Sequence, residues 1–206
     1  MQSIRSDNKF QDFIAELENC DFDILLVSEP WRDKREEVIV TAAGHKVFLS
    51  GGSCRNGVGI CVSRRLLDQI SGLTFLTISD RICCLHFTIG HYNFQTFSCY
   101  MPTSWEPDDA AEHVYDLLGM LLVSCDQAGA IPIIGGDFNA VIGNPLPGDD
   151  DDLLGTCGFG PRNDRGWMFV RWVLEHGLFI QSRLDRNIRH DDCWTYQCSM
   201  DGVLVI

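Results

Sequence analysis

Hydrophobic positions alternate along this chain between short β-branched runs and longer stretches with helical spacing. Apolar residues three and four positions apart predict amphipathic helices at Asn8–Asn19, at Pro107–Gln127 and from Trp167 through His176. Short apolar or alternating runs bounded by turn residues predict strands. The predicted strands are Asp23–Ser28, Val38–Thr41, Lys46–Leu49, Val58–Ser63, Leu73–Ile78, Arg81–Ile89, Asn93–Tyr100, Ile131–Ile134, Leu178–Gln181, Trp194–Gln197 and Val203–Ile206.

Length and composition indicate a globular protein of one domain, which we place at residues 1–206. The chain has 206 residues, 45% of them hydrophobic, and this is enough for one domain with a real core. No apolar run approaches the roughly 20 residues of a membrane helix. The start of the chain is too polar for a secretory signal, so we expect an intracellular protein, nuclear or cytoplasmic.

The ten cysteines form no CxxC pair and no Cys/His cluster with zinc spacing. Several of them, such as Cys61 and Cys99, lie within apolar runs, where cysteine behaves as a small hydrophobic residue. This usage predicts a reducing compartment and no disulfide framework. His86 and His91 have no carboxylate or cysteine partner at ligand spacing, so we interpret both as structural.

The charge balance argues against tight binding to nucleic acid. Sixteen Lys and Arg residues stand against 29 Asp and Glu residues, which gives a formal net charge of −13. Proteins that grip many phosphates are usually basic, because phosphate neutralisation dominates their affinity. An acidic chain is therefore expected to bind a polyanion only weakly, through local contacts.

The stretch Ile131–Val141 carries the most informative polar residues. An apolar run suited to a buried strand ends at Gly135 and Gly136, and Asp137 and Asn139 follow at once. Polar groups at the carboxyl end of a buried strand are a common place for a site. The pattern alone is equally typical of a turn in which Asp and Asn bond their own backbone.

Two further predicted strands end in polar residues. Glu29 follows the run Asp23–Ser28, where its carboxylate suits a hard divalent cation or, alternatively, a solvated strand end. Tyr100 ends another strand just before Pro102, a position that by itself is typical of an ordinary aromatic residue at a strand end. The acidic run Asp149–Asp152 lies in a Gly- and Pro-rich loop, and we interpret it as solvated rather than as a metal site.

These segments resemble the endonuclease/exonuclease/phosphatase superfamily of metal-dependent phosphodiesterases. The sequence GGDFNAVIG is similar to its signature, and LLVSEPW is similar to the segment that carries its metal-binding glutamate. A third segment, G-x-G-x-R-N-x-R-G, resembles the endonuclease domains of non-LTR retrotransposons and contains Asn163 and Arg165. Thr195 and Asp201 match the family's threonine beside an aromatic residue and its near-terminal aspartate, although fewer residues separate them than in the retrotransposon pattern.

The resemblance implies a four-layer α/β/β/α fold, a two-sheet sandwich flanked by helices, and in-line attack by water on a phosphodiester. In this interpretation Asp137, Asn139, Tyr100 and Asp201 are catalytic, and Glu29 binds Mg²⁺, with Mn²⁺ as an alternative. Asn163, Arg165 and Thr195 would contact the substrate, which is weakly bound DNA, and no membrane is involved. For Asn163 and Arg165, a helix cap with a surface arginine is an equally open alternative.

Two departures from the family pattern predict reduced activity. The family's first strand precedes its first helix, whereas this chain begins almost at the helix, and the family's terminal Ser-Asp-His has no match after Asp201. The alternative function is therefore a catalytically inactive remnant of a retrotransposon endonuclease that acts at most as a binding module. A phosphoinositide phosphatase of the same superfamily fits the carboxylates but not the R-N-x-R-G segment.

Overall fold

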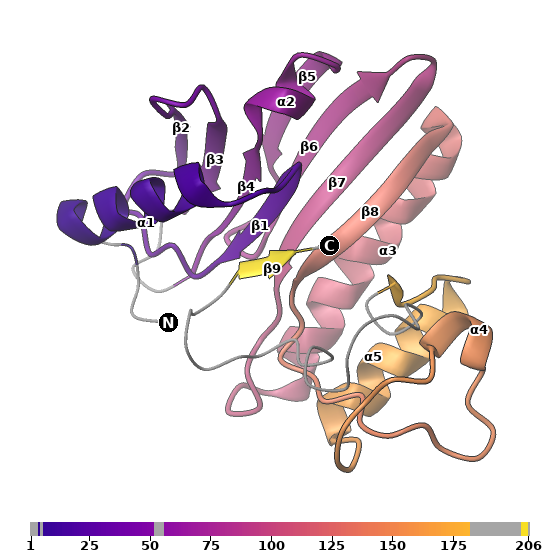
Figure 1. The fold of residues 1–206 in the computed structure, drawn as a ribbon. Coiled ribbons are helices and arrows are strands. Elements are labelled where there is room, and N and C mark those ends of the chain that lie inside the picture. The colour runs from indigo at the N-terminus through magenta and orange to yellow at the C-terminus, as the bar shows by residue number, and fades with distance from the viewer. Residues whose placement is uncertain (1–3, 5, 52–55, 182–202, 206) are drawn as a thin grey trace.

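The computed structural model describes residues 4, 6–51, 56–181 and 203–205 (Figure 1). Its helices are α1 (Asp7–Asn19), α2 (Arg64–Leu67), α3 (Asp108–Ala128), α4 (Asp151–Leu154) and α5 (Asp164–Glu175). Its strands are β1 (Ile24–Ser28), β2 (Glu36–Val40), β3 (Lys46–Ser50), β4 (Val58–Val62), β5 (Ser71–Thr77), β6 (Ile82–Ile89), β7 (Tyr92–Tyr100), β8 (Ala130–Asp137) and β9 (Val203–Val205).

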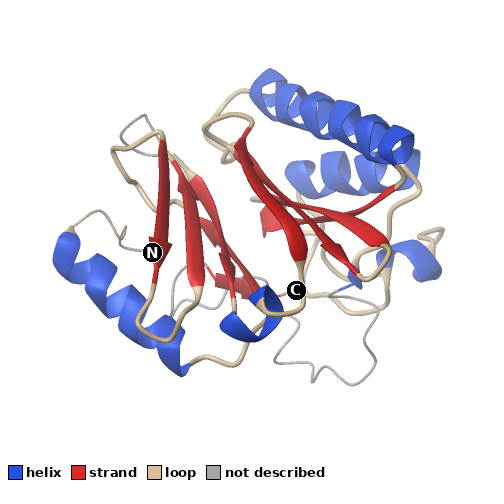
Figure 2. Cartoon of the chain, turned by 90° about the horizontal axis from the view of Figure 1, so that it is seen from above, coloured by secondary structure: helices blue, strands red, loops and turns tan. Residues whose placement is uncertain are grey.

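The strands form two sheets that pack face to face, and helices cover both outer faces (Figure 2). The first sheet has the order β2-β3-β4-β1-β9, and the second has the order β5-β6-β7-β8. The predicted two-layer α/β sandwich with flanking helices is therefore confirmed.

The second sheet contains one parallel pair, and that pair positions the strand ends. Strand β7 leads into α3, which ends at Gly129 in the left-handed conformation, and the chain returns as β8 beside β7. Their register places Tyr100 opposite Asp137, at the last residue of each strand. Because parallel strands end at the same edge of a sheet, two polar groups far apart in sequence become neighbours.

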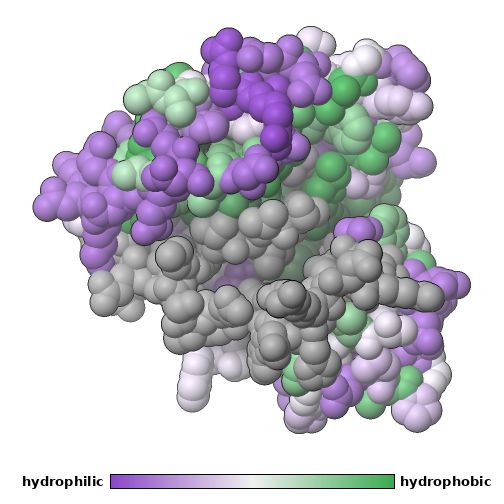
Figure 3. Space-filling model, viewed as in Figure 1, coloured by the Kyte–Doolittle hydropathy of each residue, from purple (hydrophilic) through white to green (hydrophobic). Residues whose placement is uncertain are grey.

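Three layers of apolar side chains hold this arrangement together. Between the sheets, Leu26 and Ile60 of the first sheet pack with Leu85 and Phe87 of the second. On the outer face of the first sheet, α1 buries Phe10 and Leu17 and presents mainly hydrophilic residues to solvent (Figure 3).

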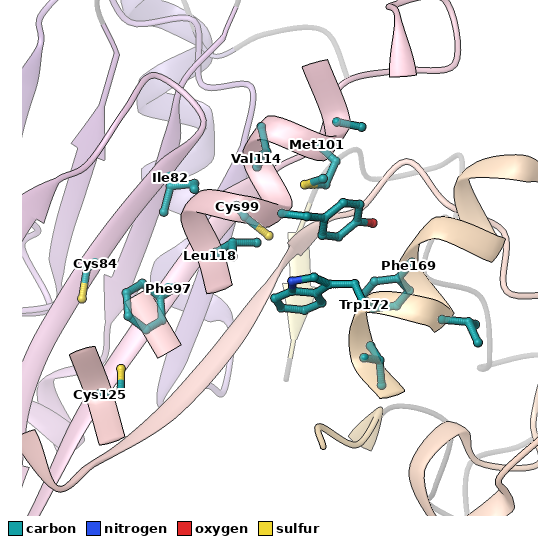
Figure 4. Packing of buried hydrophobic residues seen from close by; sticks show 14 of the residues in the cluster. Ile82, Cys84, Phe97, Cys99, Met101, Val114, Leu118, Cys125, Phe169 and Trp172 are labelled. Atoms are coloured by element: carbon teal, nitrogen blue, oxygen red, sulfur yellow. The ribbon is translucent and has the colours of Figure 1, made fainter. Parts of the chain in front are cut away.

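On the outer face of the second sheet, α3 and α5 share one core. Phe169 and Trp172 of α5 belong to the same buried cluster as Leu118 of α3 and Cys99 of β7 (Figure 4). The ring centroids of Trp172 and Tyr115 lie 5.3 Å apart. This core fixes α5 beside the loop that follows β7.

One sequence-based prediction about the region after Asn144 is wrong, and another holds only in part. Leu178–Gln181 forms no strand, since the Leu178 and Ile180 amides donate to carbonyls of Val173 and Leu153, at 3.0 and 2.7 Å. In the acidic run, Asp150–Asp152 are exposed as predicted, whereas Asp149 is 9% exposed and binds the buried Arg162 guanidinium. Its neighbour Asp150 caps the short helix α4.

The predicted strand Trp194–Gln197 lies outside the described residues. Seven cysteines in the described part of the chain are free thiols. No helix in that part is both long and apolar enough to span a membrane.

Candidate active site

Tyr100, Asp137 and their neighbours form the joint at which the two parallel strands end. Beyond their paired positions, the Met101 amide donates to the Asp137 carbonyl at 2.8 Å, which carries the β7–β8 ladder one step further. Tyr100 is 6% exposed and Asp137 is partly exposed. The strand pairing itself therefore brings the predicted phenol and carboxylate together.

Glu29 joins this pair from the other sheet. It follows the last residue of β1, and the Tyr100 hydroxyl donates to its Oε1 at 2.5 Å. Its backbone has φ +54° and its amide donates to the Gly57 carbonyl at 3.0 Å. A glutamate in the left-handed region costs free energy that the surrounding contacts must offset, and such residues concentrate at functional sites.

Asn139 completes the group through a tight turn. Its amide donates to Asp137 Oδ1 at 2.9 Å, and its side-chain Nδ2 donates to the Met101 carbonyl at 2.7 Å. Its backbone is also left-handed, with φ +48°, a conformation that asparagine tolerates better than most residues. The Asx turn that the sequence left open is therefore present, and it fixes the Asp137 carboxylate at the strand end, where Asp137 pairs with Tyr100.

Gly136 is the glycine that this joint requires. Its φ is +133°, and a Cβ at this position would lie 1.9 Å from the Cys99 carbonyl oxygen. Any side chain here would push β8 away from β7 and separate Asp137 from Tyr100.

The electrostatics of the group favour a neutral phenol beside carboxylates. Burial, followed by the hydrogen bond to Glu29 and the charges of Glu29 and Asp137, raises the pKa of Tyr100 well above its usual range. The hydroxyl therefore stays a hydrogen-bond donor at neutral pH.

Sequence analysis missed Arg81, a cation that lies beside Tyr100. Its guanidinium carbon lies 5.4 Å from the centroid of the Tyr100 ring, and Nη2 pairs with Glu106 at 2.7 Å. Arg81 precedes β6 at a turn, where its sequence offers no motif, and only the pairing of β6 with β7 brings it to Tyr100.

Asn163 and Arg165 bind the chain itself in this structure. Asn163 caps α5, and its Oδ1 accepts from the amides of Gly166 at 2.7 Å and Val141 at 3.0 Å. Arg165 is 5% exposed, and its Nη2 donates to the carbonyl oxygens of Glu106 at 2.6 Å and Thr103 at 3.3 Å. The helix-cap alternative is thus present, the arginine is buried rather than on the surface, and direct contact with a substrate stays a prediction for both.

Thr195 and Asp201 lie outside the described residues, so their predicted roles stay predictions.

The donor chemistry of the strand ends fits a hard divalent cation. Mg²⁺ takes oxygen ligands, usually one or two carboxylates together with several waters. Glu29 and Asp137 supply two partly buried carboxylates whose negative charges a cation would offset. Among the described residues, no three His, Cys, Asp or Glu side chains are grouped closely enough to hold a metal. A cation here would therefore keep water ligands, with Glu29 as its protein ligand.

Comparison with models of protein families identifies the family of this chain. A sequence model described as the Endonuclease/Exonuclease/phosphatase family matches residues 2–192, which include Glu29, Tyr100, Asp137 and Asn139 but neither Thr195 nor Asp201. A search of curated proteins finds no match.

Proposed function

The chain belongs to the endonuclease/exonuclease/phosphatase family, and we propose that it is a divalent-cation-dependent phosphodiesterase whose substrate is DNA. Membership implies cleavage of phosphoester bonds in nucleic acid or in another phosphoester. The proposal takes residues 1–206 as one domain and the retrotransposon type of endonuclease as the nearest class, on the similarity of the R-N-x-R-G segment.

One observation carries the proposal, namely the convergence of four polar residues from three separate segments at the strand ends. Glu29 comes from the end of β1, Tyr100 from the end of β7, and Asp137 and Asn139 from the end of β8. A purely structural joint does not need two non-glycine residues in the left-handed region, yet Glu29 and Asn139 both adopt it. Such a cost is expected where side chains must be aimed at a ligand.

The proposed chemistry is attack by water at phosphorus as the bond to the leaving sugar oxygen breaks. Asp137 orients the water and accepts its proton, and Asn139 fixes the Asp137 carboxylate through its backbone amide. Tyr100 orients Glu29, and its neutral hydroxyl is the donor that turns to a non-bridging phosphate oxygen as charge develops. Mg²⁺, when bound by Glu29, screens the phosphate and stabilises the leaving oxygen.

The negative charge of the chain favours weak substrate binding. With a formal net charge of −13, long-range attraction of a polyanion is absent, and the affinity must come from local contacts. The hydrogen bond between Tyr100 and Glu29, which occupies both side chains, supports a second candidate, a module that binds a phosphoester without cleaving it. In that case the Tyr100–Glu29 hydrogen bond is a permanent structural contact.

Nicking of supercoiled plasmid tests the proposal. We expect nicking with Mg²⁺ or Mn²⁺, none with EDTA, and a rate about 10²- to 10³-fold lower for Glu29→Gln. Glu16→Gln is the matched control, because Glu16 is an exposed glutamate on α1. The nicking rate of wild type in the same assay also tests the prediction that this chain is less active than is usual for the family.

Calorimetric titration with Mg²⁺ separates the two candidates. Wild type should bind the cation more tightly than Glu29→Gln, whereas Glu16→Gln should match wild type. Cation binding by wild type without any nicking would favour the binding module, and equal cation binding by wild type and Glu29→Gln would remove Glu29 as the ligand.

A further inference from the structure

Trp105 is the most exposed large hydrophobic residue in the described part of the chain. Its side chain is 95% exposed, in the connection between β7 and α3 that begins directly after Tyr100. Tryptophan is usually well buried, because its large apolar surface gains most from leaving water. A fully exposed tryptophan close in sequence to a candidate active site is therefore a candidate ligand contact. Tryptophan is also one of the residue types enriched at binding hot spots.

The segment that presents Trp105 is held on both sides. Arg165 Nη2 donates to carbonyl oxygens on either side of it, those of Thr103 and Glu106. The Glu106 carboxylate accepts from the Thr103 amide at 3.0 Å and pairs with Arg81 at 2.7 Å. These contacts fix the backbone on both sides of the ring, so its exposure is built into the turn.

Trp105 lies within reach of a nucleic-acid strand that occupies the strand ends. It is five residues beyond Tyr100, so its Cα lies at most about 18 Å from that of Tyr100 at 3.3–3.6 Å per residue. Neighbouring nucleotides of one DNA strand in the duplex are about 3.4 Å apart along the axis. The ring can therefore meet a base no more than roughly five nucleotides from a phosphate held by the strand-end residues.

The charge around Trp105 selects the neutral part of a nucleotide. Its chain neighbours include Glu106, Asp108 and Asp109, the last two in the first turn of α3. Glu106 pairs with Arg81 and Asp108 pairs with Arg165, so these charges offset one another and leave no excess positive charge to attract a phosphate. Base stacking on an aromatic ring needs no positive charge. In a chain with net charge −13, stacking supplies affinity that phosphate contacts do not.

We propose that Trp105 is a stacking platform for an unpaired nucleobase that flanks the scissile phosphate. This inference rests on the proposed function and narrows its substrate class to nucleic acid with an accessible base. A small phosphoester or a lipid headgroup has no base to stack and gains nothing from Trp105.

Binding of a labelled oligonucleotide tests the platform. The probe is a short fluorescein-labelled single-stranded DNA with cleavage-resistant phosphorothioate linkages, measured by anisotropy with Mg²⁺ present. Trp105→Ala should weaken binding about 5- to 150-fold, which corresponds to loss of one stacked base, and Trp105→Phe should retain part of the affinity. Tyr92→Ala is the control, because Tyr92 is a 53% exposed aromatic residue at the opposite end of β7.

A second probe with abasic nucleotides shows whether the base is what Trp105 contacts. Wild type should bind the abasic strand as weakly as Trp105→Ala binds the normal one, and Trp105→Ala should not distinguish the two strands. The platform is overturned if Trp105→Ala lowers the affinity for the abasic strand as much as the affinity for the normal strand. It is also overturned if Trp105→Ala binds the normal strand as tightly as wild type does. If the wild type still nicks plasmid, the proposed function survives that result; a chain that neither binds nor nicks DNA refutes both.

Discussion

Two polar groups in this molecule differ in what their side chains bind. The strand-end cluster consists of Glu29, Tyr100, Asp137 and Asn139, and the helix-start cluster consists of Asn163 and Arg165. In the strand-end cluster, one side-chain hydrogen bond, from Tyr100 to Glu29, joins the two sheets, and two backbones are left-handed. In the helix-start cluster, the side chains bind backbone amides and carbonyls, and Arg165 also pairs with Asp108.

The difference shows that similarity to a family motif does not by itself give a residue its task. Both clusters lie in segments that resemble the same family, and both contain residues able to bind phosphate. The Arg165 guanidinium donates to carbonyl oxygens of the loop after β7. Arg165 therefore affects the candidate active site by holding that loop in place. The carboxylates of Asp137 and Glu29, in contrast, lie at the ends of β8 and β1. The comparison predicts that changes in the first cluster reduce activity and changes in the second reduce stability.

The largest effect is expected for Asp137→Asn. Loss of the proton acceptor should lower the nicking rate about 10²- to 10⁴-fold, which is roughly 3–5 kcal/mol of activation free energy. The asparagine oxygen still accepts from the Asn139 amide, so the turn is retained and the urea midpoint should barely change. If the variant nicks as fast as wild type, or loses stability instead of activity, then the strand-end cluster is not the catalytic group.

Arg165→Met should have the next largest effect, and on the free energy of unfolding. It removes charged hydrogen bonds to the carbonyl oxygens of Thr103 and Glu106 in a buried place, at a cost of about 2–4 kcal/mol. Urea unfolding measures this loss. The control is Arg171→Met, because Arg171 is an exposed arginine on the same helix, 3.9 Å from Glu175, and exposed pairs contribute little. A stable Arg165→Met protein that no longer binds DNA would move Arg165 into the site.

The sequence was sufficient to predict the sheets but not the partners of every polar residue. Period-two and helical spacing placed most elements within a few residues, and the ends of β1, β7 and β8 placed Glu29, Tyr100 and Asp137. Leu178–Gln181 failed because a short apolar run is equally suited to a strand and to the packed end of a helix.

Pairs that are distant in sequence were beyond such patterns. Arg81 meets Tyr100 only through strand pairing, and Asp149 meets Arg162 only through the return of a loop. Neither contact leaves a periodic or motif signal in the chain. Its place in an acidic run suggested that Asp149 is solvated. The sequence of that run does not show that its ion partner, Arg162, is buried.

Asn163→Ala should have a smaller effect than Arg165→Met, about 1–2 kcal/mol of unfolding free energy. The change removes the oxygen that accepts from the Gly166 and Val141 amides, and so weakens both the start of α5 and its link to the loop that follows β8. Asn163→Asp should restore most of the loss, because its carboxylate accepts the same bonds and suits a helix N-terminus. Rescue of stability by Asp, with nicking unchanged, would support a cap; loss of nicking in a fully stable Asn163→Ala would point to a substrate contact.

The smallest effect is expected in the alkaline pH dependence of stability, and it returns to the strand-end cluster. The pKa of Tyr100 is raised in the folded protein by burial and by Glu29 and Asp137, whereas in the unfolded chain it is about 10. Below that pH both states keep the proton and nothing changes. Above it the unfolded chain loses the proton first, so stability falls as pH rises. Tyr100→Phe should therefore show a shallower fall in urea midpoint above about pH 10 than wild type. Burial also raises the pKa values of the Cys61 and Cys99 thiols, but these contribute equally in both proteins. Identical alkaline profiles would mean that Tyr100 ionises freely in the folded state, and the buried Tyr100–Glu29 contact that joins the two sheets would then have to be abandoned.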